Sequence, residues 1–184
     1  MPNSQITSLN SSQVERVKAL LHSRGKKIRR ETLEFVVDSF QAICVALNNS
    51  KTGFPSVKAL FITEMGSDRL IKSGIEIPAD LLVYEVSETV MNEMSEVENS
   101  QGVLAICSSA GHSFDSLLAK QGNIAYFWQL QDPGNAGTIL RTADAMGMSA
   151  VITSPESVDM FSPKVVRSTA GSLWHIPVYE GVPF

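Results

Sequence analysis

The sequence predicts an α/β fold made of two successive units. Short apolar runs typical of buried strands alternate along the chain with segments whose apolar residues recur at helical spacing. Turn residues keep the connections between these segments short, which is the pattern of helices packed against a sheet. Hydrophobic residues make up 43% of the chain and charged residues 18%, so a globular core is expected.

The first unit, residues 1–108, is expected to be a three-layer α/β domain. Its first helix is indicated by the helical spacing of the apolar residues within 14–21, with Ser11 or Ser12 as the N-cap. Strands and helices then alternate. We expect strands at residues 35–37, 57–63, 81–86 and 102–107, and helices at residues 40–47, 67–73 and 87–94.

A small, polar segment at residues 109–122 predicts a linker between the units, because it is bounded by glycine and contains only a short helical piece at 114–119. The second unit, residues 123–184, reads strand, helix, strand, helix, strand. Crossover connections of this kind make the strands parallel. The strands are expected at residues 124–130, 150–153 and 174–179, and the helices at residues 135–146 and 164–170.

The turn after the first strand of the second unit concentrates the polar residues that could carry chemistry. Residues 132–135 read Asp-Pro-Gly-Asn, four strong turn formers. Asn135 stands where the helix begins, next to unpaired backbone N–H groups, and Arg141 falls off the apolar face about one turn later. Open α/β sheets bind ligands at the carboxyl ends of their strands. Taken alone, however, such a turn is more often only a turn, and such an Arg only a solvated residue.

The net charge of −4 conceals a strong asymmetry. Residues 1–30 hold seven Lys or Arg against Glu15 alone, a local charge of +6, whereas the rest of the chain carries −10. Residues 24–30 read as a basic loop, which is either a solvated charged turn or a clamp for RNA phosphates that is sensitive to salt and blind to sequence. The candidate RNA-binding residues are Arg24, Lys26, Lys27, Arg29 and Arg30.

Several other classes of protein have no support in the sequence. No apolar run reaches the ~18–20 residues that span a bilayer, and the polar N-terminus lacks a signal peptide, so we expect a cytoplasmic protein. Cys44 and Cys107 lie in apolar runs and are interpreted as buried thiols rather than a disulfide. His22, His112 and His175 lack the spacing of metal ligands, and there is no P-loop, so neither a metal nor a nucleoside triphosphate is expected.

The turn and helix that follow the first strand of the second unit also carry a family resemblance. Residues 132–138, followed by Arg141 and Ala143, resemble the first signature motif of the SpoU-type RNA ribose methyltransferases, the TrmH-like members of the SPOUT superfamily. The motif is long and ungapped, and the likeness covers nearly the whole chain. It extends to residues 162–171 and 176–178, and to residues 86–88 and 100–105, which resemble the family's N-terminal substrate-binding domain.

This resemblance implies an L30e-like domain followed by the first half of a SPOUT methyltransferase domain. It implies transfer of a methyl group from S-adenosylmethionine to a ribose 2′-hydroxyl, with ribosomal RNA as the substrate. Arg141 would grip phosphate or stabilise a developing alkoxide, and Asn135 would orient the sugar or Arg141. Further contacts with the RNA backbone are expected from Lys164, Arg167, Ser168 and Thr169.

One departure from the family pattern limits this implication. The family continues with a Gly-x-Glu segment and a terminal Ser-Leu-Asn segment, which form a trefoil knot around the cofactor, and neither is present here. We therefore expect the cofactor-binding residues beyond Phe184, and a homodimer only in the full-length form. The alternative is a non-catalytic RNA-binding protein that uses the basic segment 24–30.

Overall fold

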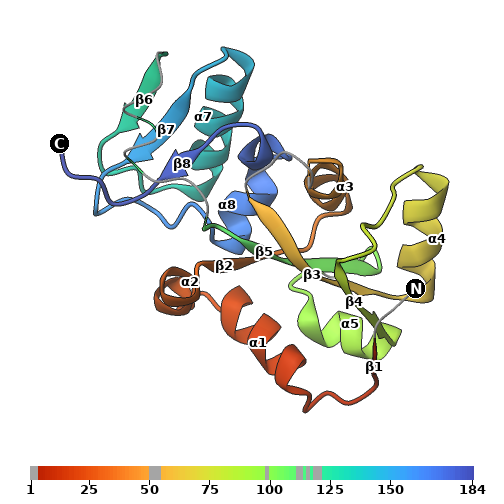
Figure 1. The fold of residues 1–184 in the computed structure, drawn as a ribbon. Coiled ribbons are helices and arrows are strands. Elements are labelled where there is room, and N and C mark those ends of the chain that lie inside the picture. Colours follow the sequence, from red (N-terminus) through yellow and green to blue (C-terminus); the bar gives the residue numbers. More distant parts are fainter. Residues whose placement is uncertain (1–3, 50–54, 98–99, 111–113, 115–116, 118–121) are drawn as a thin grey trace.

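The computed structural model describes residues 4–49, 55–97, 100–110, 114, 117 and 122–184. Within these residues the chain forms two sheets, of five and three strands (Figure 1). Each sheet lies inside one of the two units expected from the sequence. His112 and most of the helical piece predicted at 114–119 lie outside the described residues.

The five-stranded sheet has the order β1-β4-β3-β5-β2. β1, β4 and β3 are parallel, whereas β5 runs antiparallel to both β3 and β2. The predicted strands are confirmed to within about a residue or two at each end. The short edge strand β1 was not predicted. The bounds are β1 (Ser4–Ile6), β2 (Glu34–Val37), β3 (Ser56–Ile62), β4 (Leu82–Val86) and β5 (Val103–Ser108).

Helices cover both faces of this sheet, which confirms the predicted three layers (Figure 1). Successive side chains of a strand point to opposite faces. In β3, Phe61 accordingly packs with α1 and α5, and Leu60 packs with α3 and α4. The bounds are α1 (Ser12–Leu21), α2 (Lys26–Thr32), α3 (Phe40–Asn48), α4 (Glu64–Lys72) and α5 (Glu88–Met94). As predicted, Ser11 caps α1 through its hydroxyl.

The three-stranded sheet has the order β6-β7-β8, and its strands are parallel, as predicted. The prediction of a buried first strand is wrong, because β6 is an edge strand in which Ile124 is 41% exposed. The first and last strands are shorter than predicted: β6 ends at Phe127, and β8 begins only at Val178, because Trp174 belongs to a 3₁₀ turn and His175 to the turn after it. The bounds are β6 (Ile124–Phe127), α7 (Pro133–Ala145), β7 (Ala150–Thr153), α8 (Pro163–Ser168), η1 (Ser172–Trp174) and β8 (Val178–Tyr179).

The two units share one hydrophobic core. The ring of Phe35 in β2 lies 5.0 Å from that of Phe161 and 6.2 Å from that of Trp174, centroid to centroid. The same cluster of buried side chains includes Ile43 of α3 and Leu140 of α7. Because apolar burial joins the two sheets, the position of α7 relative to the first unit is fixed by packing.

Candidate functional site

The first turn of α7 is held by an aspartate cap. The Oδ1 atom of Asp132 accepts a hydrogen bond from the backbone N–H of Asn135 at 2.7 Å, and Pro133 occupies the first helical position, where its missing N–H costs nothing. The helix therefore begins two residues earlier than the sequence indicated. This geometry leaves the side chain of Asn135 exposed on the first turn, as expected.

Arg141 lies on the exposed face of the same helix. Its Nη2 atom donates a hydrogen bond to Oγ1 of Thr138 at 3.3 Å, and the Thr138 hydroxyl in turn donates to the carbonyl of Gly134 at 3.0 Å. Asn135 and Arg141 are separated by about 9 Å along the helix axis, at 1.5 Å per residue. In this structure it is thus Thr138, and not Asn135, that orients Arg141. The sequence reasoning missed Thr138, although its i,i+3 spacing to Arg141 was a usable signal.

The surface beside Arg141 is hollowed but open. A cavity of about 360 Å³ is lined by Thr138, Arg141, Thr142, Ala145 and Met146, all from α7 or its C-cap. A hollow walled by one helix does not enclose a small molecule, because enclosed sites bury most of the ligand surface. It does leave the guanidinium group of Arg141 accessible to an anionic ligand.

Helix α8 presents less to the surface than the sequence predicted. Lys164 is exposed, but Nη1 of Arg167 pairs with Oδ2 of Asp38 at 2.7 Å and thereby ties α8 to the first unit. Burial raises the pKa of Asp38, and the Arg167 guanidinium opposes part of that rise. Thr169 is fully buried, with its hydroxyl 2.8 Å from the carbonyl of Val166, so this placement removes it from the candidates for RNA contact.

Ser168 serves the contact between α7 and α8. Its hydroxyl lies 2.9 Å from the carbonyl of Pro133 and 2.7 Å from that of Val165. A Cβ atom on Gly137 would meet the Ser168 hydroxyl at 2.1 Å, so the absence of a side chain there allows the two helices to approach closely. Ser168 is therefore a residue of the helix contact, placed next to the first turn that carries Asn135.

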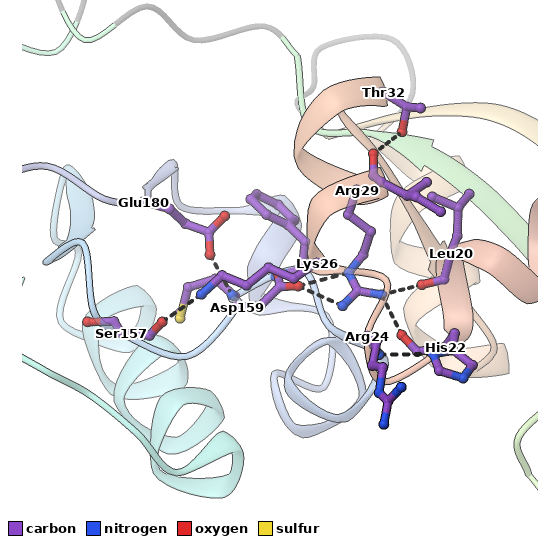
Figure 2. Close-up of polar contacts among 12 residues, drawn as sticks. Leu20, His22, Arg24, Lys26, Arg29, Thr32, Ser157, Asp159 and Glu180 are labelled. Carbon is purple, nitrogen blue, oxygen red and sulfur yellow. Dashed lines mark hydrogen bonds and ion pairs between the residues drawn. The ribbon is translucent and has the colours of Figure 1, made fainter.

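The prediction of a basic loop at residues 24–30 is wrong, because most of it forms helix α2. Arg29 is 4% exposed, and its guanidinium group makes two contacts with Oδ2 of Asp159, from Nε at 2.8 Å and from Nη2 at 2.7 Å. Its Nη1 atom donates to the backbone carbonyls of Leu20 and His22 (Figure 2). A guanidinium that is buried and already paired with a carboxylate and two carbonyls is out of reach of a phosphate, so Arg29 also leaves the candidates for RNA contact.

The basic residues of α2 divide between two faces. Lys26 and Arg29, three residues apart, point toward the loop between β7 and α8, and Nζ of Lys26 donates to the carbonyl of Ser157 at 3.1 Å. Lys27 and Arg30, also three residues apart, are exposed, and so is Arg24 just before the helix. The 3.8 Å pair between Lys27 and Glu31 is solvent-exposed, and such pairs restrain a side chain only weakly.

Comparison with known proteins identifies the class to which this fold and motif belong. The model of the SpoU rRNA Methylase family matches residues 123–182, and that of the MRM3-like substrate binding domain matches residues 14–105. The chain belongs to the SpoU rRNA methylase family. A crystal structure of an AdoMet-bound rRNA methyltransferase from Sinorhizobium meliloti superposes with a TM-score of 0.77 at 29% identity, over 96% of this chain and 64% of that one.

Two curated relatives are similar over most of this chain. A 23S rRNA (guanosine(2553)-2′-O)-methyltransferase of Bacillus subtilis is 32% identical over 174 residues, which are 92% of this chain and 63% of that protein. A 23S rRNA (uridine(2479)-2′-O)-methyltransferase of Streptomyces viridochromogenes is 28% identical over 94% of this chain and 58% of its own length. The chain thus spans about three fifths of the length of these relatives.

The sequence predictions about membrane spans, metal ligands and cysteines can also be compared with the structure. In the part of the chain that the structure describes, no helix combines the length and apolarity needed to cross a membrane, and no three His, Cys, Asp or Glu side chains gather as metal ligands. Cys44 and Cys107 are both free thiols, as predicted, and burial raises the pKa of each.

Proposed function

We propose that this chain forms the RNA-binding and arginine-bearing part of an S-adenosylmethionine-dependent methyltransferase that modifies a ribose 2′-hydroxyl of ribosomal RNA. The observation that carries the proposal is helix α7, whose aspartate-capped first turn exposes Asn135 and whose outer face exposes Arg141, in a chain of the SpoU family. The names of the relatives from Bacillus subtilis and Streptomyces viridochromogenes support the choice of ribosomal RNA and of the 2′-oxygen.

Arg141 is suited to hold negative charge as it develops on the ribose oxygen. When the 2′-hydroxyl attacks a methyl group, the oxygen loses its proton, and a planar fork of N–H donors stabilises the resulting partial charge or an adjacent phosphate. A guanidinium group is not deprotonated in proteins, so Arg141 is not the base that takes this proton. The hydrogen bond that Arg141 donates to Thr138 limits the directions in which the guanidinium can point.

Asn135 is suited to bind the ribose. Its amide can donate to one sugar oxygen and accept from another, and it stands at the positive end of α7. The described residues beside Arg141 form an open hollow rather than an enclosed site, so they do not by themselves fit S-adenosylmethionine. The relatives contain residues with no counterpart in this chain, and we propose that the donor site draws on such residues.

The proposed RNA-binding surface consists of exposed cations on two helices. Arg24 lies just before α2 and Lys27 on its outer side, and Lys164 lies on α8. Arg30 is exposed at the edge of a cavity that Asp159 and Glu180 also line. Arg24, Lys27 and Arg30 all lie inside the segment that matches the substrate-binding domain. Cations of this kind bind phosphates without reading sequence, and they release counterions when they do so. As the family resemblance implies, we further propose that the full-length protein is a cytoplasmic homodimer.

Methyl transfer is tested with a longer protein that contains this chain. The assay follows the tritiated methyl group of S-adenosylmethionine into ribosomal RNA. Arg141→Ala is expected to lower turnover by about 10²–10³-fold, the usual cost of losing a donor to transition-state charge. The control is Lys72→Ala, which removes an exposed cation of α4 far from the α7 motif along the chain. Wild-type turnover of the Arg141→Ala enzyme would contradict the assigned role.

RNA capture is tested with the 184-residue chain itself. The affinity for a fluorescein-labelled stem-loop RNA is measured by anisotropy in a series of salt concentrations. Lys27→Gln and Arg30→Gln are each expected to reduce the slope of log affinity against log salt by about 0.7–0.9, one phosphate contact each, whereas Lys72→Gln leaves it unchanged. RNA binding combined with a lack of methyl transfer by the longer protein would favour the non-catalytic alternative.

A further inference from the structure

The loop between β7 and α8, residues 154–162, is bonded on two sides. One side contacts the basic helix α2 of the first unit, and the other contacts residues 128–132, which lead into α7. We call residues 154–162 the coupling segment. It is the place where the RNA-binding unit and the Asn135–Arg141 motif touch the same stretch of chain.

The contact with α2 is buried and charged. The side chains of Arg29 and Asp159 are 3% and 8% exposed, and the Arg29 guanidinium is further held by two carbonyls at the end of α1 (Figure 2). Lys26 adds a hydrogen bond to the carbonyl of Ser157. From the far side of the segment, Oε1 of Glu180 accepts the backbone N–H of Met160 at 2.8 Å. The segment is thus fixed to α2 by a desolvated ion pair rather than by a surface pair.

The contact with the loop before α7 is a small ladder of hydrogen bonds. The backbone N–H of Leu130 donates to the Ser157 hydroxyl at 3.2 Å, and its carbonyl accepts from Val158 N–H at 2.6 Å. The N–H of Gln129 donates to the Ser154 hydroxyl at 2.8 Å, so consecutive residues of the loop are bonded to the segment. Two residues after Leu130 comes Asp132, the cap of α7.

The helix that follows the segment reaches α7 directly. The segment ends at Ser162, the N-cap of α8. At the other end of α8, the Ser168 hydroxyl lies 2.9 Å from the carbonyl of Pro133. The segment therefore contacts the loop just before α7, and the helix that follows the segment contacts the first turn of α7 itself. A displacement of α2 would therefore strain these two contacts, since coupling between distant elements is carried by chains of hydrogen bonds and packed side chains.

We propose that the coupling segment holds α2 and the first turn of α7 in one fixed arrangement, with Arg29 and Asp159 as positioning residues. RNA bound by the exposed cations of α2 is then presented to Asn135 and Arg141 at a set distance and orientation. Only this last step rests on the proposed function. The mechanical link itself is a property of the folded chain, and it assigns Arg29, a cation of the basic segment, to alignment instead of to RNA.

Hydrogen–deuterium exchange of the 184-residue chain tests the link without RNA. The mild variant is Lys26→Met, which removes the bond to Ser157, and its matched control is Lys27→Met on the exposed side of the same helix. Loss of one such bond is expected to speed exchange of peptides 154–162 and 128–135 by about fivefold, the fold-change for a typical hydrogen bond. Lys27→Met is expected to change neither, and peptide 82–94 serves as the reference in both variants.

Faster exchange of 154–162 with no change in 128–135 would overturn the link. Asp159→Asn is the stronger variant. If it fails to fold, or if it also speeds exchange of the reference peptide, the test depends on Lys26→Met alone. A second arm adds the stem-loop RNA to the wild-type chain, which is expected to slow exchange of both α2 and 128–135. Slowing confined to α2 would refute the presentation of RNA, whereas an absence of binding would count against the proposed function and leave the link itself standing.

Discussion

The contact between α7 and α8 depends on a glycine and provides a sharp test of the packing that holds the motif. Ala in place of Gly137 would put a Cβ atom 2.1 Å from the Ser168 hydroxyl and 2.5 Å from the Ser168 carbonyl carbon. The second of these neighbours is backbone, which cannot rotate away as a flexible side chain would. The helices must therefore separate, and the Ser168 contact with Pro133 must lengthen.

The size of the effect follows from opposing contributions. Ala favours a helix interior over Gly by about 0.8–1.0 kcal/mol, which acts to stabilise the variant. Overpacking a tight contact costs about 1–3 kcal/mol, and weakening the Ser168 hydrogen bond costs about 1 kcal/mol more. The net expectation for Gly137→Ala is a loss of about 1–3 kcal/mol in the free energy of unfolding. For a chain of this length that corresponds to a fall in Tm of roughly 2–4 °C for each kcal/mol.

Gly134→Ala, three residues earlier in the same helix, is the matched control. The nearest atom to its added Cβ would be Oδ1 of the Asp132 side chain, at 3.2 Å, with no backbone atom in the way. This carboxylate also caps α7, so the gain from Ala is offset by pressure on the cap, and the variant is expected to stay within about 1 kcal/mol of the wild type. Urea unfolding of all three proteins, followed by circular dichroism, measures the difference. Equal stability of the two alanine variants would refute the assignment of Gly137 to the α7–α8 contact.

Three further predictions follow from buried charges and thiols. Burial and the nearby Asp159 raise the pKa of Glu180, so the folded state holds the proton to higher pH than the unfolded chain does, and stability falls as pH rises through that interval. The Tm of the Glu180→Gln variant is therefore expected to be higher than that of the wild type near pH 8 and equal to it at about pH 4. A Tm difference that is the same at both pH values would contradict this. Arg29→Met is expected to cost about 3–5 kcal/mol by stranding the Asp159 carboxylate, whereas adding Asp159→Leu should recover part of that loss in urea unfolding; strict additivity would argue against a direct pair. Fully buried Cys107 should react with Ellman's reagent only in urea, and half-buried Cys44 slowly in the native state, so rapid native reaction of two thiols would be the contrary result.

The sequence predicted those elements whose signals are local. The spacing of Val14, Val17, Leu20 and Leu21 placed α1 correctly, because a helix that buries one face repeats its apolar residues along that face. The strands at the centre of the larger sheet were equally clear from their apolar runs. The short strand β1 was missed, since its pairing with β4 joins residues about eighty positions apart and leaves only a faint trace in its own three residues.

The motif of α7 was found from the sequence, but its internal contacts were not. The Asp-Pro-Gly-Asn turn and the helical spacing after it placed Asn135 at the helix start and Arg141 on the exposed face. Which side chain orients Arg141 depends on rotamers as well as on spacing, and the structure shows Thr138 in that role. Thr169 was chosen for its place in a motif, whereas its burial at the C-cap of α8 decides what it can touch.

The basic segment shows most clearly what a sequence leaves undetermined. Its five cations look alike as a run of charge, yet one of them, Arg29, is buried and paired with Asp159, 130 positions away in the chain. Once the run is known to be helical, spacing puts Arg29 and Arg30 beside Lys26, at i,i+3 and i,i+4, and turns Lys27 away from them. What no local pattern supplies is the identity of the inward face, which is set by Asp159 and Ser157 in the second unit. One helix thus carries both the exposed cations that we propose for RNA and the buried Arg29 that bonds it to the second unit.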